Sequence, residues 1–116
     1  MTAPEPSKPM PRFSRGQLGW WLLGLLPVAL AAPPSAERQA ELLHLLVQDC
    51  GSCHGLRLKG GLGPPLLPAD LAAKPADFVA ATIYYGRPGT PMPPWRPFMN
   101  ESEAAWLAQR LKEGLP

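Results

Sequence analysis

Apolar residues recur with a helical period between Ser35 and His54. Leucines and a valine stand three and four positions apart there, which is the spacing of one helix face. Ser35 precedes the stretch as a candidate N-cap, and Glu37 lies in the first turn, near the positive end of the helix. The pattern predicts an amphipathic helix that continues into residues 50–54.

Two later stretches show the same period. Residues 75–86 begin with a proline, which suits the first helical position, and end with a glycine, which suits a helix stop. Residues 100–113 begin with Asn100 and have Glu103 three positions later, which is typical of a capping box. These two stretches predict two more helices.

Two stretches lack the helical period of apolar residues. Residues 55–74 contain four glycines and three prolines, with one helical turn expected near Asp70, and residues 88–97 contain five prolines. Such segments form loops and not helices or central strands. Three helices and two long loops predict a small all-α domain. Covering a large planar cofactor would give loops of this length a role.

The beginning of the chain has the composition of an export signal. Basic residues and prolines up to residue 19 precede an apolar run of about a dozen residues, which is typical of a signal h-region and short for a spanning helix. We expect residues 1–31 to be a signal peptide cleaved after Ala31. Residues 32–116 would then form the mature periplasmic domain, with no membrane attachment. Retention of the run as an anchor is the alternative.

The charge pattern excludes one class of partner. Eight basic and eight acidic side chains follow Ala31, so this part is formally neutral and has no clustered basic stretch. Nucleic-acid binding is therefore not expected. Neutrality also predicts weak electrostatic steering of a protein partner. A domain this small is expected to be a monomer.

The chain has two cysteines, Cys50 and Cys53, and His54 follows directly in the sequence CGSCH. C-x-x-C-H is the attachment signature of c-type haem. A redox dithiol would need a β-α-β setting, and no strand pattern is present. A structural zinc site needs four ligands, and only His44 is left to join Cys50, Cys53 and His54. A plain disulfide leaves His54 unexplained. We expect one haem c attached through Cys50 and Cys53, with His54 as an axial ligand of the iron.

Met92 is the expected second axial ligand, because the prolines on both sides of it restrict the backbone. Met99 is the competing sulfur and is expected to fill the core beside Phe98. His44 is a weaker competitor, since it lies on the same predicted helix as His54. An iron ligated by both residues transfers electrons and does not bind substrate, so no enzyme activity is expected. A ligand-binding or catalytic haem protein with a labile Met92 is the alternative.

Residues near the haem are predicted from the spacing. The carbonyl of Pro64 can accept a hydrogen bond from the second ring nitrogen of His54, and Leu66 can reach the haem face. Trp95 is a candidate for packing on the haem or for donating to a propionate. An ordinary turn and plain core packing are the alternatives. Candidate cations for the propionates are Lys59, Arg87 and Arg96.

The order of these features resembles the monohaem class I cytochromes c. The features are the CGSCHG motif, the sequence GPPL at residues 63–66, a helix ending in IYYG, Met92 before a proline, and a last helix with EAAWL. The sequence GRPGTPMPPW at residues 86–95 is further similar to the short NirC-type cytochromes and to the haem c domain of cytochrome cd-type nitrite reductase. The resemblance implies the class I fold and a periplasmic electron carrier in denitrification. The implied partner is that nitrite reductase, served either as its electron donor or in maturation of its d-type haem.

Overall fold

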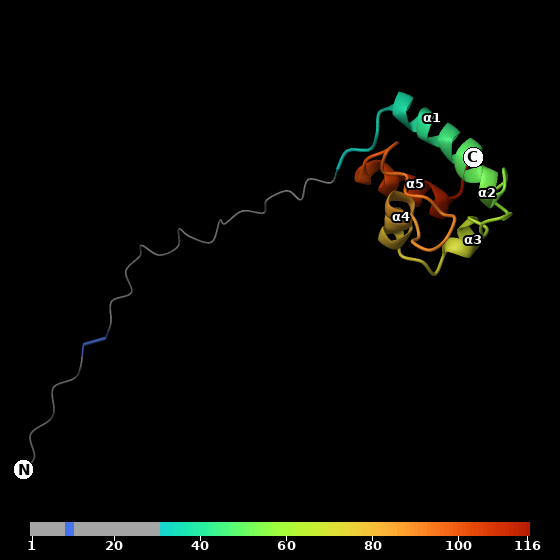
Figure 1. Ribbon diagram of the computed structural model, residues 1–116. Coiled ribbons are helices and arrows are strands. Elements are labelled where there is room, and N and C mark those ends of the chain that lie inside the picture. The colour runs from blue at the N-terminus through green and yellow to red at the C-terminus, as the bar shows by residue number, and fades with distance from the viewer. Residues whose placement is uncertain (1–8, 11–30) are drawn as a thin grey trace, which may run out of the picture. The chain divides into compact units, whose positions relative to one another are not determined.

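The computed structural model describes residues 9–10 and 31–116, and its first helix, α1 (Ala36–Leu45), begins directly after Ser35 (Figure 1). The Ser35 hydroxyl accepts a hydrogen bond from the backbone N–H of Arg38 at 3.2 Å, so it is the predicted N-cap. The helix continues through a π-helical stretch, η1 (Leu46–Cys50), into α2 (Gly51–His54). The prediction of one helix ending in the cysteine motif is confirmed.

The remaining helices are α3 (Pro68–Leu71), α4 (Ala76–Tyr85) and α5 (Glu101–Glu113). Pro75 precedes α4 as its N-cap, so the prediction that this proline is the first helical residue is wrong by one position. Both hydrogen bonds of the predicted capping box at Asn100 are present. Residues 31–116 are helical without a strand, and the all-α prediction is confirmed.

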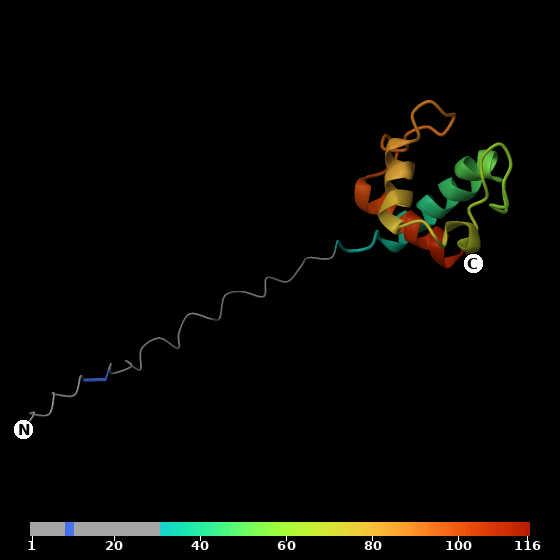
Figure 2. The same ribbon diagram turned by 90° about the horizontal axis from the view of Figure 1, so that it is seen from below.

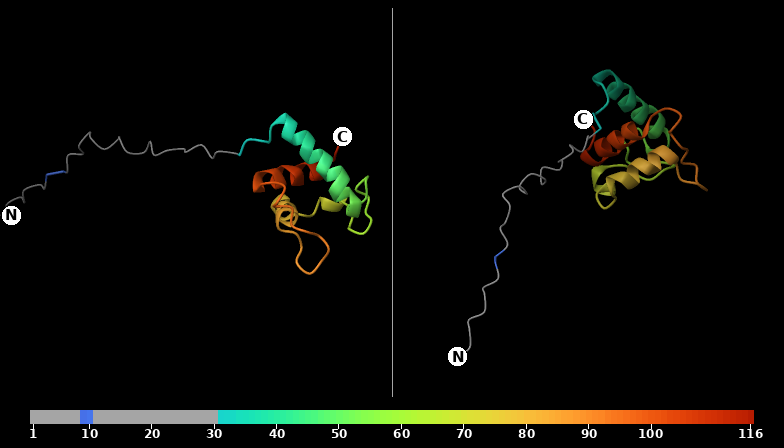
Figure 3. Two further views of the ribbon diagram at one scale, coloured as in Figure 1. Left: turned by 45° about the horizontal axis from the view of Figure 1, so that its top comes forward. Right: turned by 90° about the vertical axis from the view of Figure 1, so that its left-hand side faces the viewer.

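The core lies where α1, α4 and α5 meet. Leu42 of α1 and Leu46 of η1 are almost fully buried, as are the small residues Ala104 and Ala108 of α5. Figure 3 shows α1 running across α5, while α4 lies along α5. Small side chains at such a crossing let the helix backbones approach closely, which fixes the end of α1 that leads into the cysteine motif.

Arg38 connects α1 to the start of α5. Its guanidinium donates to the two carboxylate oxygens of Glu103 at 2.7 and 3.2 Å and to the carbonyl of Phe98 at 2.7 Å. The Glu103 carboxylate also accepts from the backbone N–H of Asn100 at 2.9 Å. One carboxylate therefore caps α5 and anchors α1 to it.

Lys112 connects α5 to α3. Its ammonium group donates to the carbonyl of Leu71 at 2.7 Å and to that of Lys74. These carbonyls lie at and just after the C-terminal end of α3, where helical C=O groups lack intrahelical partners.

Among the described residues, no helix has the length and apolar character needed to cross a membrane. The predicted signal peptide lies outside the described residues apart from residues 9–10 and Ala31. Its cleavage therefore stays a prediction.

Candidate functional site

The cysteine motif occupies the last turn of the helix formed by α1, η1 and α2. Residues three and four positions apart lie on the same side of a helix, so Cys50, Cys53 and His54 share one side. Cys53 is exposed, Cys50 is half-buried, and His54 is buried with 8% of its surface exposed. Both cysteines are free thiols. The motif thus presents two thiols and one imidazole from a single helical turn.

The His54 ring is fixed by the loop that follows it. Its Nδ1 atom lies 2.7 Å from the carbonyl oxygen of Pro64. Because a carbonyl can only accept, Nδ1 carries the proton, and Nε2 keeps the lone pair that binds a metal. The hydrogen bond predicted from the spacing is present. Its role beside a haem stays a prediction.

Glycines allow the loop to pack this closely. A Cβ atom on Gly63 would lie 2.8 Å from the His54 ring, and one on Gly61 would lie 2.8 Å from the Cys53 carbonyl oxygen. The N–H groups of Gly63 and Gly60 donate to the carbonyls of Cys53 and His54, both at 2.8 Å. The loop therefore caps the motif helix and holds the imidazole at the same time.

The environment of Cys50 counts against a redox dithiol. Burial, assisted by the negative charge of Asp49, raises the pKa of the Cys50 thiol to about 11. Reactive dithiols need a lowered pKa, because the thiolate is the nucleophile. Within residues 9–10 and 31–116, no group of three or more His, Cys, Asp or Glu side chains is arranged to hold a metal ion. The described residues therefore give no support to a zinc site.

Met92 lies on a loop that is tied at its base to the end of α4. The N–H groups of Trp95 and Arg96 donate to the carbonyls of Ile83 and Tyr84 at 3.1 and 3.2 Å. Gly86 has a positive φ of 71°, and a Cβ atom there would meet the backbone of Met92 and of the next two residues within 2.8 Å. The chain therefore turns sharply at Gly86, and the far end of the loop returns to the end of α4.

Within this loop, Thr90 connects the start of the loop to Met92. Its hydroxyl donates to the carbonyl of Arg87 at 2.7 Å and accepts from the N–H of Met92 at 3.3 Å. The Arg87 N–H donates in turn to the Met92 carbonyl at 3.1 Å. The backbone of Met92 is thus held on both sides, while its side chain is only half-buried. No pattern considered in the sequence pointed to Thr90.

Met99 and His44, the alternatives to Met92 as second axial ligand, do not lie on the Met92 loop. Met99 is buried in the core, with 5% of its surface exposed, as predicted, whereas Phe98 beside it is 60% exposed. The expectation that both fill the core is therefore wrong for Phe98, because the Met99 side chain alone enters the core. Trp95 is half-buried against the core, with its ring centroid 5.7 Å from that of Phe98. His44 is exposed on α1.

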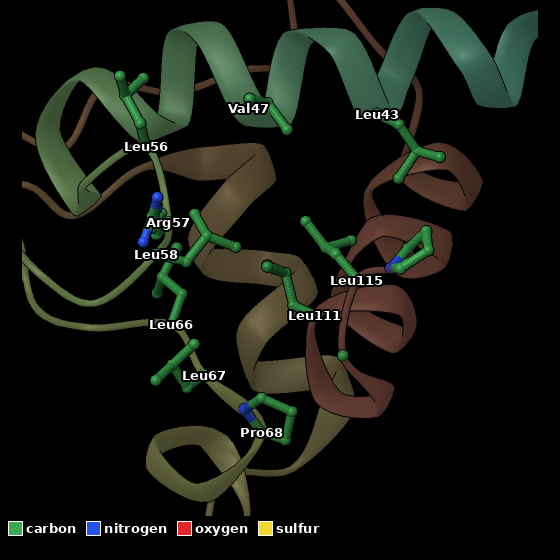
Figure 4. Close-up of a pocket in the computed structure, with 12 residues that line it drawn as sticks. Leu43, Val47, Leu56, Arg57, Leu58, Leu66, Leu67, Pro68, Leu111 and Leu115 are labelled. Atoms are coloured by element: carbon green, nitrogen blue, oxygen red, sulfur yellow. The ribbon is translucent and has the colours of Figure 1, made fainter.

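A hollow of about 590 Å³ lies between α1, residues 56–58, residues 66–68 and the C-terminal end of α5 (Figure 4). Its wall is apolar apart from Arg57, and it includes Leu66. Cys50, Cys53, His54 and Met92 do not line it. The predicted contact of Leu66 with a haem therefore stays a prediction. Leu58, also in the wall, has the unusual positive φ of 57°, which no sequence pattern indicates.

Comparisons with known proteins agree with this geometry. Residues 37–109 match the family described as cytochrome c oxidase, cbb3-type, subunit III. The chain is 60% identical to cytochrome c55X of Stutzerimonas stutzeri over 92 residues, which cover 79% of this chain and 81% of the relative. A solved structure of the c-type cytochrome NirC superposes with a TM-score of 0.69 at 59% identity, covering 70% of this chain and 95% of that one.

A second solved structure, dihydro-heme d1 dehydrogenase NirN in complex with DHE, is similar over part of its length. The TM-score is 0.58 at 32% identity, and the match covers 64% of this chain but 16% of that larger protein. The likeness is therefore to one small part of the dehydrogenase.

Proposed function

The chain belongs to the cytochrome c55X family of NirC-type c-type cytochromes, which are electron carriers, and we propose that it acts in the periplasm with one haem ligated by His54 and Met92. The observation that carries the proposal is the arrangement of the motif. Two thiols and a buried imidazole lie on one helical turn, and the imidazole donates to the Pro64 carbonyl.

The residues fit a covalently attached haem. Cys50 and Cys53 are unpaired thiols, so both sulfurs are available for thioether bonds to the vinyl groups. One nitrogen of His54 is hydrogen-bonded to a carbonyl, and the other has no hydrogen-bond partner among residues 9–10 and 31–116, which is the usual state of a metal-ligating histidine. The donor set of imidazole and thioether is the one that gives cytochromes c a raised potential.

The two loops around the site hold the proposed ligands still. Gly63 packs against one side of the His54 ring, and Thr90 fixes the backbone of Met92. A bound haem supplies a one-electron couple of its iron. The chain's part is to keep both ligand atoms in place in the two oxidation states, so that little rearrangement accompanies transfer. Cys53 is exposed, which supports the motif edge as the point where electrons enter and leave.

We propose cytochrome cd-type nitrite reductase as the partner of this electron carrier. The likeness to the NirC structure supports a role beside that enzyme. The likeness to part of a dihydro-heme d1 dehydrogenase supports maturation of the d-type haem as the second possible role. Mixing the reduced protein with the purified reductase and nitrite separates the two, because only an electron donor is reoxidised at a catalytically useful rate.

The proposed ligation is tested by absorption and magnetic circular dichroism spectra of the periplasmically expressed protein. Met92→Ala should lose the sulfur–iron charge-transfer band of the oxidised protein. Met99→Ala is the matched control and should keep the band, because Met99 lies in the core. A band that survives in Met92→Ala would show that another residue is the ligand. Rapid, tight carbon monoxide binding by the reduced wild type would instead favour a ligand-binding haem protein.

A further inference from the structure

The Met92 loop, residues 86–96, projects from the helical unit. Figure 2 shows the loop, in orange, extending beyond the end of α4. Residues 87–91, 93 and 94 are all exposed, so the outer part of the loop is not held by packing in the core. The position of Met92 therefore depends on what holds the base of the loop.

A chain of hydrogen bonds runs from this base to α1. The Trp95 N–H donates to the Ile83 carbonyl of α4 at 3.1 Å, and the Trp95 carbonyl accepts from the Phe98 N–H at 2.9 Å. The Phe98 carbonyl accepts in turn from the Arg38 guanidinium of α1 at 2.7 Å. Because Phe98 is 60% exposed, packing of its side chain contributes little to holding this segment.

Arg38 belongs to the helix that ends in the cysteine motif. α1, η1 and α2 follow one another without interruption from Ala36 to His54, and Arg38 lies in the first turn. The Phe98 carbonyl lies on the segment that follows the Met92 loop. The helix that carries His54 is thus hydrogen-bonded, through one guanidinium, to the segment next to the loop that carries Met92.

The other bonds of Arg38 fix the direction of its side chain. Nε and Nη2 donate to the two carboxylate oxygens of Glu103 at 2.7 and 3.2 Å, and Nη1 donates to Glu41 at 2.8 Å. Nη2 is also the atom that donates to Phe98. A guanidinium holds its five donors in a rigid fork, so the pair with Glu103 directs Nη2 at the Phe98 carbonyl. Hydrogen bonds from a charged donor are roughly twice as strong as neutral ones.

We propose that Arg38 is a positioning residue for Met92, and that its bond to the Phe98 carbonyl sets how readily another ligand replaces the Met92 sulfur at the iron. The inference rests on the proposed ligation of haem by Met92. Replacement of a ligand carried on a loop requires the loop to open, and each hydrogen bond at the base of the loop opposes that local opening. Thr90 acts within the loop, whereas Arg38 acts from another helix.

The test is an optical titration of the oxidised haem-loaded protein with imidazole. Arg38→Gln should bind imidazole about three- to tenfold more tightly than the wild type, because a charge-assisted hydrogen bond no longer opposes opening of the loop. Its reduction potential should fall, since thioether ligation raises the potential. Amide hydrogen exchange is a readout that does not involve the iron. The N–H groups of Trp95 and Arg96, which bond to α4, should exchange faster in the variant.

Lys112→Gln is the matched control. Lys112 also donates to backbone carbonyls of another segment, those of Leu71 and Lys74, but it lies in the last turn of α5, far along the chain from the Met92 loop. This variant should lower the urea midpoint and leave the imidazole affinity and the exchange of the loop unchanged. Glu41→Gln removes only the exposed pair of Arg38 and should bind imidazole as the wild type does.

Arg38→Lys keeps the proposal testable if Arg38→Gln does not fold. A lysine retains the charge beside Glu103 but lacks the fork geometry, so the imidazole affinity should rise about twofold or more. Wild-type affinity and exchange in the Arg38 variants would overturn the positioning role. An equal rise in Lys112→Gln would also overturn it, because general destabilisation would then be the cause. An oxidised wild type without the sulfur–iron charge-transfer band would instead overturn the proposed Met92 ligation, before any variant is compared.

Discussion

His54 and Pro64 lie ten positions apart in the chain, and the ring nitrogen Nδ1 of the first is 2.7 Å from the carbonyl oxygen of the second. This hydrogen bond fixes the tautomer of the imidazole, since the carbonyl needs a donor. It also fixes the ring plane, because Gly63 lies directly against the ring. The geometry of the proposed axial ligand therefore depends on a loop and not on the motif helix alone.

Gly63→Ala should disturb that ligand. The added methyl group would stand 2.8 Å from the His54 ring, so the ring or the loop must move, at a cost of about 1–3 kcal/mol. We expect a lower urea midpoint and a changed reduction potential. Leu62→Ala is the control in the same loop, because Leu62 is almost fully exposed. An unchanged potential in Gly63→Ala would contradict a positioning role for this contact.

Thr90→Val should loosen Met92. The variant keeps the size of the side chain but removes the hydroxyl that accepts from the Met92 N–H. A lost hydrogen bond of this kind costs about 0.5–1.5 kcal/mol. Added imidazole should therefore displace the proposed Met92 ligand with an affinity about two- to tenfold higher than in the wild type, measured by optical titration of the oxidised protein.

Thr90→Ser is the matched control for this substitution, since it retains the hydroxyl and should bind imidazole as the wild type does. Thr82→Val removes another threonine hydroxyl, one that donates to the Phe78 carbonyl within α4, and should also have no effect. Equal imidazole affinities in Thr90→Val and Thr90→Ser would rule out the contribution of the hydroxyl.

The helix starts and the loops could be predicted from the sequence, because the residues that determine each of them lie close together in the chain. Ser35 and Asn100 mark helix starts within four residues of the atoms they bond. Met92 and Met99 could be separated because prolines surround the first and a capping box follows the second. Each inference used only backbone geometry and neighbouring side chains.

The parts that sequence reasoning missed depend on tertiary contacts. Glu103 was expected only as a capping residue, yet it also binds Arg38, which is 65 positions away. Such a pair is set by the crossing of α1 and α5, which no local pattern encodes. The backbone of Leu58 and the hollow beside it likewise arise where four segments meet.

The Arg38–Glu103 pair makes stability depend on pH. The hydrogen bond from Arg38 lowers the pKa of Glu103 below its ordinary value. A lowered carboxylate pKa stabilises the fold above the unfolded value of about 4.3, and this stabilisation is lost as the pH falls through the folded value. Glu103→Gln should cost about 1–2 kcal/mol at pH 7, allowing for solvent screening of the partly exposed guanidinium.

Urea unfolding of the wild type and Glu103→Gln at pH 7 and at pH 3 measures this effect. The difference between the two proteins should shrink as the pH falls, since the wild-type carboxylate becomes protonated. Glu113→Gln is the control, because Glu113 belongs to an exposed pair with Arg110 and should cost less than about 1 kcal/mol. A constant difference across this pH range would contradict the lowered pKa of Glu103.

The two cysteines give the most direct test of the cofactor. If both sulfurs form thioethers to haem, the periplasmic protein unfolded in guanidinium should contain no thiol that reacts with a maleimide reagent. A dithiol protein would instead react twice, and the rates in the folded state would tell the two sulfurs apart. Cys53 is exposed, whereas burial raises the pKa of Cys50 to about 11, so Cys53 would react first. Two reactive thiols would refute covalent haem, and with it the ligand roles proposed for His54 and Met92.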